Sequence, residues 1–192
     1  PAGPGQYLHE WLQLGTWPAG PAWFIWMLLA FDLLVVVTAL ALPGLWPRLA
    51  ELWSRARPWV PFLALVGLST ALYVPMRAAF GPYTWFTWGP FYGQWSRVLI
   101  YLLYFATGMI AGMSTAREGV LSPEGPLARN HVRLIVAAVP VFGLAITIFV
   151  AAVTDRSSAV WWAAALMYPL CCAVSNVALL SLFLGRVSAR RP

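Results

Sequence analysis

Apolar residues fall into five long runs along the chain, and short segments that hold most of the charged residues separate these runs. Each run is about 20 residues or longer, the length that an α-helix needs to cross the hydrocarbon core of a bilayer. The alternation of apolar and polar residues that marks a membrane β-barrel does not appear. The pattern predicts an all-α bundle of five transmembrane helices within one membrane domain. The runs cover residues 22–42, 59–79, 95–115, 132–153 and 160–186.

The composition favours a membrane protein and excludes a soluble one. Of the 192 residues, 61% are hydrophobic and only 9% are charged, whereas about a quarter of the residues in a soluble domain are charged. So few charges cannot cover a surface that faces water. We therefore expect an integral membrane protein surrounded by lipid, located in a bacterial cytoplasmic membrane.

The arginines indicate an orientation. The chain has twelve basic residues, six acidic residues and a formal net charge of +6. Arginines are frequent in residues 43–58, in residues 116–133 and in the C-terminal tail, and are absent before residue 22 and from residues 80–94. Because arginine-rich loops stay in the cytoplasm, the pattern predicts an N-terminus outside and a C-terminus in the cytoplasm. This explanation suits arginines between apolar runs better than nucleic-acid binding does, so we expect no nucleic-acid partner.

Asp32 is the most unusual residue, because it is an acid about midway along the first run. An acid at the bilayer centre costs about 2.5–3.5 kcal/mol, and such residues usually face the interior of a bundle. Thr70, Tyr104 and Tyr168 lie at a similar depth in three other runs. Two interpretations stay open: a polar layer that binds a substrate or protons, and a hydrogen-bonded packing layer. In both, we expect the Asp32 carboxylate to pair with a residue of another helix.

Arg77 and Arg97 flank the uncharged segment 81–94, which contains six aromatic residues. One interpretation is that both side chains extend to lipid headgroups, as long cationic side chains near helix ends often do. The alternative is that they line an outward cavity that binds an anion or a polar substrate. The aromatic faces of the segment suit sugar rings as well as the membrane interface.

On the opposite side of the membrane, Arg129, His131 and Arg133 gather at the start of the fourth run. The cytoplasmic excess of positive charge explains them. The alternative is a site for a cytosolic anion such as a phosphate of CoA, which a helix N-terminus also favours. The adjacent Cys171 and Cys172 suggest neither a disulfide framework nor a metal site, and we expect no metal cofactor.

Three local patterns resemble, in their order along the chain, the membrane-bound acyltransferase family 3. The first is the aromatic and leucine-rich stretch of residues 23–33. The second is residues 89–97, followed by the tyrosines and glycines of the third run. The third is residues 168–183, which a basic tail follows. Together these patterns cover most of the chain.

The resemblance implies an enzyme that transfers an acyl group, often acetyl, from a cytosolic donor to an extracytoplasmic carbohydrate-type acceptor. It implies acetyl-CoA as the co-substrate, and it implies that this chain is a middle-to-rear fragment of the fold. The matching positions that would line the shared cavity are Trp23, Trp26, Asp32, Gln94 and Arg97. To these we add the polar candidates of the preceding paragraphs, Thr70, Arg77, Tyr104 and Tyr168, with Arg129, His131 and Arg133 on the donor side.

The chain also departs from the family. The family's catalytic histidine on the first helix and its Arg-x-x-Arg pair have no counterpart here, and neither His9 nor His131 inherits the catalytic role. We expect residues to be missing upstream of Pro1, and we expect the chain to be inactive alone. Two other functions stay open: a carrier or flippase with a midplane site at Asp32, and a structural membrane subunit.

Overall fold

The computed structural model describes residues 3–13, 23–57, 59–114, 121–155 and 157–187. Within these residues, five helices are long and apolar enough to cross a membrane, which confirms the five predicted spans. Each begins and ends within a few residues of the predicted run. The chain is therefore an integral membrane protein. The helices are α2 (Trp23–Ala41), α4 (Trp59–Phe80), α5 (Trp95–Met113), α7 (His131–Thr154) and α8 (Ser158–Leu182), which the short π-helix η3 (Phe183–Val187) continues.

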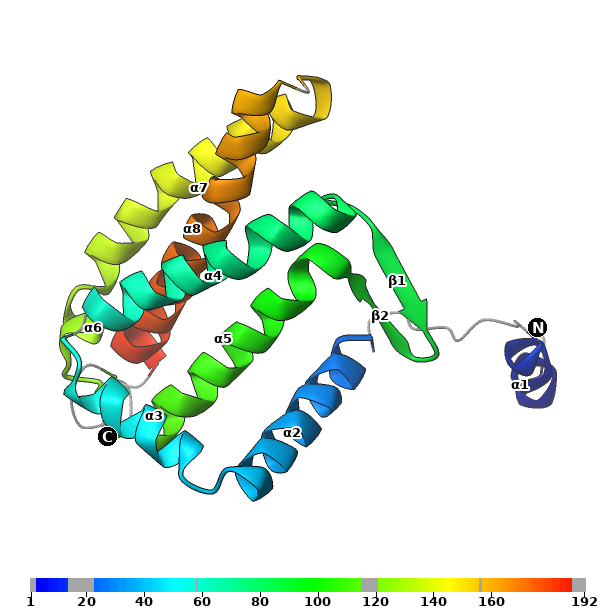
Figure 1. Cartoon of the computed structure of the whole chain (residues 1–192), viewed down its shortest axis with the longest axis horizontal. Helices are drawn as coiled ribbons and strands as arrows, with labels where there is room; N and C mark the ends of the chain where they lie inside the picture. Colours follow the sequence, from blue (N-terminus) through cyan, green and yellow to red (C-terminus); the bar gives the residue numbers. More distant parts are fainter. Residues whose placement is uncertain (1–2, 14–22, 58, 115–120, 156, 188–192) are drawn as a thin grey trace.

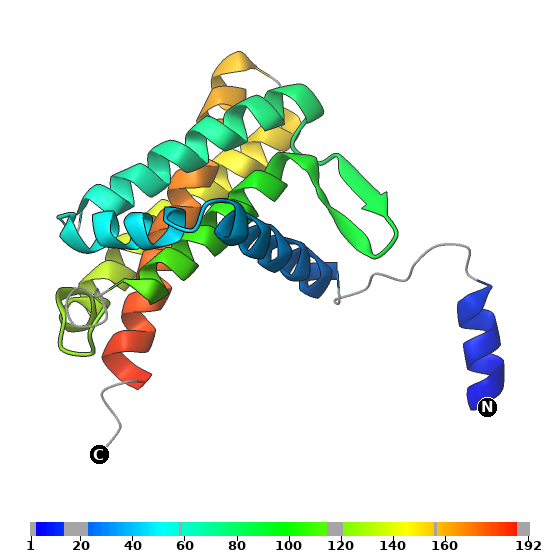
Figure 2. The ribbon, with the colours of Figure 1, turned by 60° about the horizontal axis from the view of Figure 1, so that its bottom comes forward.

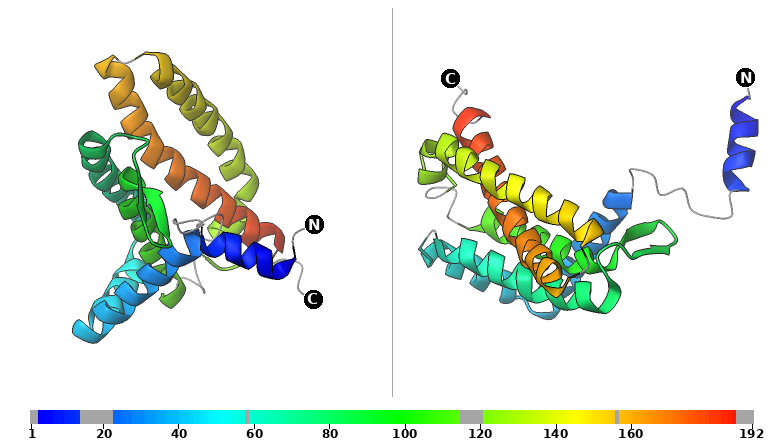
Figure 3. Two further views of the ribbon diagram at one scale, coloured as in Figure 1. Left: turned by 90° about the vertical axis from the view of Figure 1, so that its right-hand side faces the viewer. Right: turned by 90° about the horizontal axis from the view of Figure 1, so that it is seen from above.

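Four of the long helices form the body of the molecule. Helices α7 and α8 pack closely along their lengths, and α8 also packs on α4, which lies beside α5 (Figure 1; Figure 3). Helix α2 lies at the edge, where it touches the hairpin, α5 and α3 but diverges from the other long helices (Figure 2). The core is therefore the interface of α4, α5 and α8, and small buried residues on α8 allow the close approach.

The uncharged segment between the second and third spans forms a β-hairpin of strands β1 (Trp85–Trp88) and β2 (Phe91–Gln94). Gly89 occupies the first central position of the two-residue turn with φ of +53°, and a proline follows it. A positive φ at this position matches the twist of paired strands, and glycine reaches it without strain. The turn therefore fixes an antiparallel ladder at the point where α4 ends and α5 begins.

A short helix that the sequence prediction treated as a loop lies at the other end of the bundle. Helix α3 (Leu45–Arg55) packs against α5 and presents its charged residues outward. Helix α6 (Pro126–Arg129) and η3 lie at the same end. We call this end the α3 end and the opposite one the hairpin end. Before the first span, helix α1 (Pro4–Leu12) stands apart from the bundle (Figure 1).

Candidate functional site

Two buried arginines mark the hairpin end of the bundle. Arg77, in the last turn of α4, is only 6% exposed. Arg97, in the first turn of α5, is half-buried. A side chain that is buried to this degree does not extend to lipid headgroups, so the headgroup interpretation is wrong for Arg77. The alternative, in which the arginines belong to a site inside the protein, fits their position.

Aromatic rings surround both guanidinium groups. Tyr73 of α4 and Tyr168 of α8 stack with their ring centroids 4.6 Å apart. The Arg97 guanidinium lies over the Tyr168 ring at 5.0 Å. Arg77 lies 5.3 Å from the Trp161 ring centroid and donates a hydrogen bond of 3.3 Å to the hydroxyl of Tyr73. Cation–π contacts of this kind partly compensate the desolvation of a buried cation.

The described residues provide no carboxylate counter-ion for the two arginines. Among the residues that the structure describes, no acidic side chain forms a salt bridge with either Arg77 or Arg97. The salt bridge between Arg55 and Glu51 lies instead on the exposed face of α3. The hairpin end therefore holds two permanent positive charges, compensated in the described part of the chain by aromatic rings and hydroxyl groups.

Several polar atoms at this interface are buried without a hydrogen-bond partner. Within the described residues these atoms are Ser69 Oγ, Arg77 Nε, Gln94 Oε1, Arg97 Nε and Tyr104 Oη. All five lie on α4, on α5 or at the end of β2. Buried polar groups are usually satisfied, so such a concentration calls for water or a ligand.

The spacing of these residues along the chain places them on shared helix faces. Ser69, Tyr73 and Arg77 are four residues apart and share one face of α4. Arg97 and Tyr104 share a face of α5, and Tyr104 reaches the vicinity of Ser69. We call Ser69, Tyr73, Arg77, Arg97, Tyr104 and Tyr168 the polar track. It runs along the α4–α5–α8 interface from the hairpin end toward the middle of the spans.

The predicted polar layer across four helices does not form. Asp32 is exposed on α2, and it makes no hydrogen bond or ion pair with another described residue. The expectation that Asp32 faces the bundle is therefore wrong. Thr70 donates its hydroxyl to the Val66 carbonyl of its own helix at 2.8 Å. Tyr104 and Tyr168 do lie in the interior, but they belong to the polar track and do not meet Asp32.

The two tryptophans of the first span have a packing role. The Trp23 ring lies 6.3 Å from the Tyr101 ring, and the Trp26 ring lies edge-on to Phe91 at 6.4 Å. These contacts attach the start of α2 to α5 and to the hairpin. Trp23 therefore reaches the periphery of the polar track through Tyr101, which also lies near Arg97.

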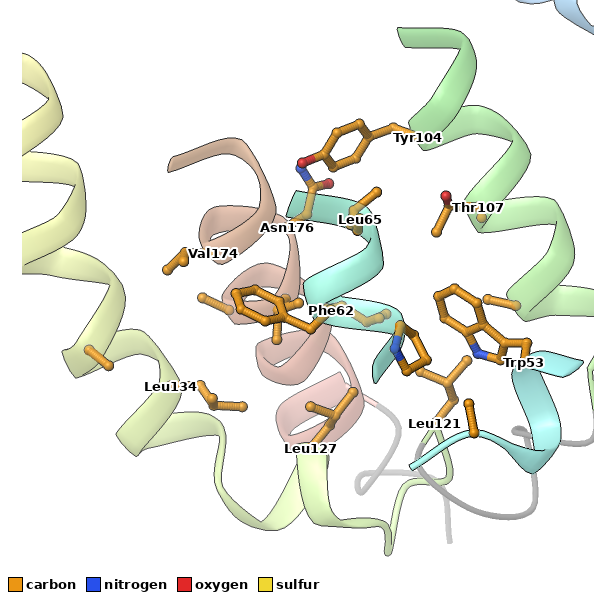
Figure 4. Close-up of a pocket in the computed structure, with 18 of the residues that line it drawn as sticks. Trp53, Phe62, Leu65, Tyr104, Thr107, Leu121, Leu127, Leu134, Val174 and Asn176 are labelled. Carbon is orange, nitrogen blue, oxygen red and sulfur yellow. The ribbon is translucent and has the colours of Figure 1, made fainter. Parts of the chain in front are cut away.

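An apolar cavity of about 660 Å³ occupies the other half of the bundle. It is lined by residues of α3, α4, α5, α7 and α8, and it is open to the surface, because lining residues such as Ala137 and Asn176 are exposed. Trp53, Leu121 and Leu127 line it toward the α3 end, and Tyr104 and Asn176 line its opposite end, where their polar groups point toward one another (Figure 4). The Asn176 amide also donates to the Cys172 carbonyl at 2.8 Å. Tyr104 thus belongs both to the cavity and to the polar track.

The donor-side candidates do not converge on one site. His131 Nδ1 lies 2.7 Å from the Ala128 carbonyl, and Arg186 Nε donates to His131 Nε2 at 3.3 Å. A carbonyl accepts only from a protonated nitrogen, so the proton of neutral His131 is on Nδ1. His131 therefore holds the end of α8 against α6, while Arg129 and Arg133 are exposed nearby.

The sequence analysis missed three residues of the hairpin-end site: Ser69, Tyr73 and Trp161. A signal for Tyr73 and Ser69 was present, because they precede Arg77 by four and eight residues on the same helix face. Among the described residues, no group of three metal-ligating side chains occurs.

No family model, curated protein or solved structure matches the chain. The features of the chain that bear on function are therefore the cavity, the polar track and the distribution of charge.

Proposed function

We propose that the chain is part of an integral membrane acyltransferase. In this proposal it helps to transfer an acyl group, acetyl in the first instance, from a cytosolic CoA thioester to a carbohydrate-type acceptor on the opposite side of the membrane. The membrane is a bacterial cytoplasmic membrane. The observation that carries the proposal is the apolar cavity, which extends from the α3 end to the polar groups of Tyr104 and Asn176 midway along the spans.

The orientation follows from the charges of the two ends. Arginines of the α3 end are exposed, whereas Arg77 and Arg97 at the hairpin end are buried or half-buried. Exposed arginines mark the cytoplasmic side, so the α3 end faces the donor and the hairpin end faces the acceptor. We therefore propose an N-terminus outside and a C-terminus in the cytoplasm. The exposed arginines are Arg48, Arg55, Arg57, Arg129, Arg133 and Arg186.

The cavity suits the acyl end of a thioester. Its volume lies within the range of about 300–1,000 Å³ that is typical of small-molecule sites, and its walls are mainly leucine, valine and alanine. The exposed arginines at the α3 end would attract the phosphates of CoA, while the pantetheine chain with its acyl group enters the apolar cavity. The carbonyl would then lie near the hydroxyl of Tyr104, which is close to Ser69.

The roles of the residues are binding and orientation. A hydroxyl donor placed at a carbonyl stabilises the negative charge that develops on its oxygen during acyl transfer, and Tyr104 has this position in our proposal. We assign no catalytic base in this chain. His131 is engaged at the α3 end with Ala128 and Arg186, and His9 lies on α1, apart from the bundle.

The rival functions make different demands on the same residues. A carrier with its site at Asp32 requires that residue inside the bundle, whereas Asp32 is exposed. A purely structural subunit requires no cavity, so ligand binding in the cavity distinguishes it from our proposal.

Binding of the donor is the direct test. The purified chain, in lipid nanodiscs, is exposed to an acyl-CoA analogue with a photoreactive diazirine in the acyl group, and the labelled peptides are identified by mass spectrometry. We expect labelling of cavity residues on α5 and α8, with competition by acetyl-CoA. Ala137→Phe, which fills the cavity from α7, should abolish labelling.

Val150→Phe is the matched control, since it adds a ring to the same helix at an exposed position outside the cavity lining. Equal labelling of the two variants, or labelling that acetyl-CoA does not reduce, would refute a donor site in the cavity.

Topology is tested independently with reporter fusions. Fusions after Arg57 and after Arg129 should report cytoplasm, and a fusion after Thr87, in the hairpin, should report the outside. The reverse pattern would place the cavity mouth on the wrong side for a cytosolic donor.

A further inference from the structure

The two arginines of the hairpin end have a charge that the described residues leave without a counter-ion. Arginine cannot be deprotonated in a protein, so the positive charge persists when the side chain is buried. Burial of a charge is unfavourable unless the charge is paired and hydrogen-bonded. Arg77 is 6% exposed and the Nε atoms of Arg77 and Arg97 both lack a partner. Stacked rings compensate only part of this cost.

The start of α5 adds to the positive potential. The first N–H groups of a helix have no acceptor within the helix, and the helix dipole makes this end positive. Gln94, at the N-cap position, makes no capping hydrogen bond to them. Gln94 is itself only 6% exposed, and its side-chain oxygen has no partner. Arg97 belongs to the same first turn. The Trp95 N–H donates to the Thr84 carbonyl at 3.1 Å, so the Arg97 cation lies with the remaining N–H groups of this turn.

We propose that the hairpin end binds an anionic group, a carboxylate or a phosphate, through the guanidinium of Arg97 and the first turn of α5. Arg97 is half-buried and so remains reachable from the surface. Arg77 contacts Tyr73, the ring that stacks on Tyr168, and not the Tyr168 ring that Arg97 covers. It acts as a second cation that strengthens the potential in a poorly solvated site, without direct contact with the anion.

The chemistry of the neighbours excludes a cationic ligand and favours an anion. At the hairpin end, the groups that lack a hydrogen-bond partner are the Nε–H groups of Arg77 and Arg97, which are donors, and the side-chain oxygen of Gln94, which is an acceptor. A neutral sugar would satisfy hydroxyl groups but would leave both positive charges without compensation. An anionic group compensates the charge and accepts the hydrogen bonds at once.

The same anionic chemistry has two sources, a soluble molecule and the headgroup of an anionic lipid. The experiment separates them with two kinds of nanodisc. One contains phosphatidylcholine and is titrated with inorganic phosphate against chloride at constant ionic strength. The other contains phosphatidylglycerol and receives no phosphate. In both, thermal unfolding is followed by tryptophan fluorescence, because a ligand that binds only the folded state raises the melting temperature.

We expect phosphate or phosphatidylglycerol to raise the melting temperature of the wild-type chain. Arg97→Gln should weaken phosphate binding by about tenfold or more, since it removes charge-assisted hydrogen bonds. Arg77→Gln should weaken it less, and Arg97→Lys should have an intermediate effect because it keeps the charge without the planar fork. The control is Arg48→Gln, which removes the same charge from an exposed position at the α3 end and should bind as the wild type does.

A response in the phosphate arm identifies a soluble anion, and a response confined to phosphatidylglycerol identifies a lipid headgroup; both support the site. The proposal fails if the wild type responds in neither arm, or if Arg48→Gln loses as much affinity as Arg97→Gln. If Arg97→Gln does not fold, Arg97→Lys and the wild-type titrations still decide. Since inorganic phosphate is no acyl donor, a failure here leaves the donor experiment unaffected.

Discussion

The same three helices build two different environments at the two ends of the bundle. At the hairpin end, α4, α5 and α8 contribute tyrosine, tryptophan and arginine side chains that fill the interface and bury positive charge. Toward the α3 end, the same helices contribute leucine, valine, alanine and glycine and leave a cavity of about 660 Å³. The long side chains fill the space between the helices, whereas the short ones do not.

This difference separates polar recognition from apolar recognition within one interface. The filled end offers charge and hydrogen-bond donors, and the hollow end offers volume without charge. Tyr104 lies at the boundary, because it lines the cavity and belongs to the polar track. In the proposed function, the donor would enter from one end, the acceptor from the other, and the two would meet near this residue.

The largest expected effect is on packing at the filled end. Tyr73 is 1% exposed and stacks on Tyr168, so Tyr73→Ala should lower the free energy of unfolding by about 3–5 kcal/mol. Phe62 is also an aromatic residue of α4, but it lines the cavity and is half-buried. Phe62→Ala should therefore lower the free energy of unfolding clearly less than Tyr73→Ala does. Denaturant titration in micelles measures both, and equal losses would show that the two ends are packed alike.

A second prediction concerns α2, which belongs to neither end. Asp32 is exposed in the middle of an apolar helix, so Asp32→Leu should favour membrane insertion of α2 by about 2.5–3.5 kcal/mol. A glycosylation-based insertion assay measures the change. Val36→Leu, at another exposed position of α2, is the control and should have little effect. Insertion that Asp32→Leu leaves unchanged or impairs would indicate a partner for the carboxylate.

The sequence could predict where the spanning helices lie along the chain, but not in which direction their side chains point. The five helices follow from apolar runs that are too long for anything but a membrane crossing. The direction of the Asp32 side chain cannot be predicted in this way. Apart from Asp32 itself, α2 has apolar residues all around, so no hydrophobic stripe identifies the side that faces the bundle. The position of Asp32 midway along its helix was predictable, whereas the face of the helix on which it lies was not.

The hairpin-end site was predictable in part. The residues Arg77 and Arg97 were visible as cations beside apolar runs, but their burial depends on rings from α8, which is distant in sequence. The hairpin itself depends on a two-residue turn at Gly89 between aromatic residues. Helix α3 was also missed, although Leu45, Leu49 and Trp53 recur at helical spacing in its sequence.

A smaller effect is expected where α8 ends. A Cβ atom at Gly185 would lie 2.6 Å from His131 Nδ1 and 2.7 Å from the Ala128 carbonyl oxygen. Because the carbonyl belongs to the backbone, rotation of a side chain cannot relieve both contacts. Gly185→Ala should destabilise the folded chain by about 1–3 kcal/mol, as measured by thermal unfolding in micelles. Gly143→Ala on α7, where a Cβ meets nothing within 4 Å, is the control; a loss of the same size there would contradict the explanation.

The smallest predicted effect has the opposite sign and concerns the two glycines of α5 that are spaced as in helix–helix contact motifs. A Cβ at Gly108 or at Gly112 would meet no atom within 4 Å, so within the described chain neither glycine serves close packing. Alanine is favoured over glycine inside a helix by about 0.5–1 kcal/mol, and Gly112→Ala should stabilise the chain by that amount. Gly108→Ala should do the same while it narrows the cavity slightly, since Gly108 is one of its lining residues.

Paired unfolding curves at several protein concentrations measure this gain in stability. If the substitutions instead reduce stability, and do so more at high concentration, α5 uses this glycine surface to contact another helix in the membrane, and the hollow end is then closed by a partner rather than open to a ligand.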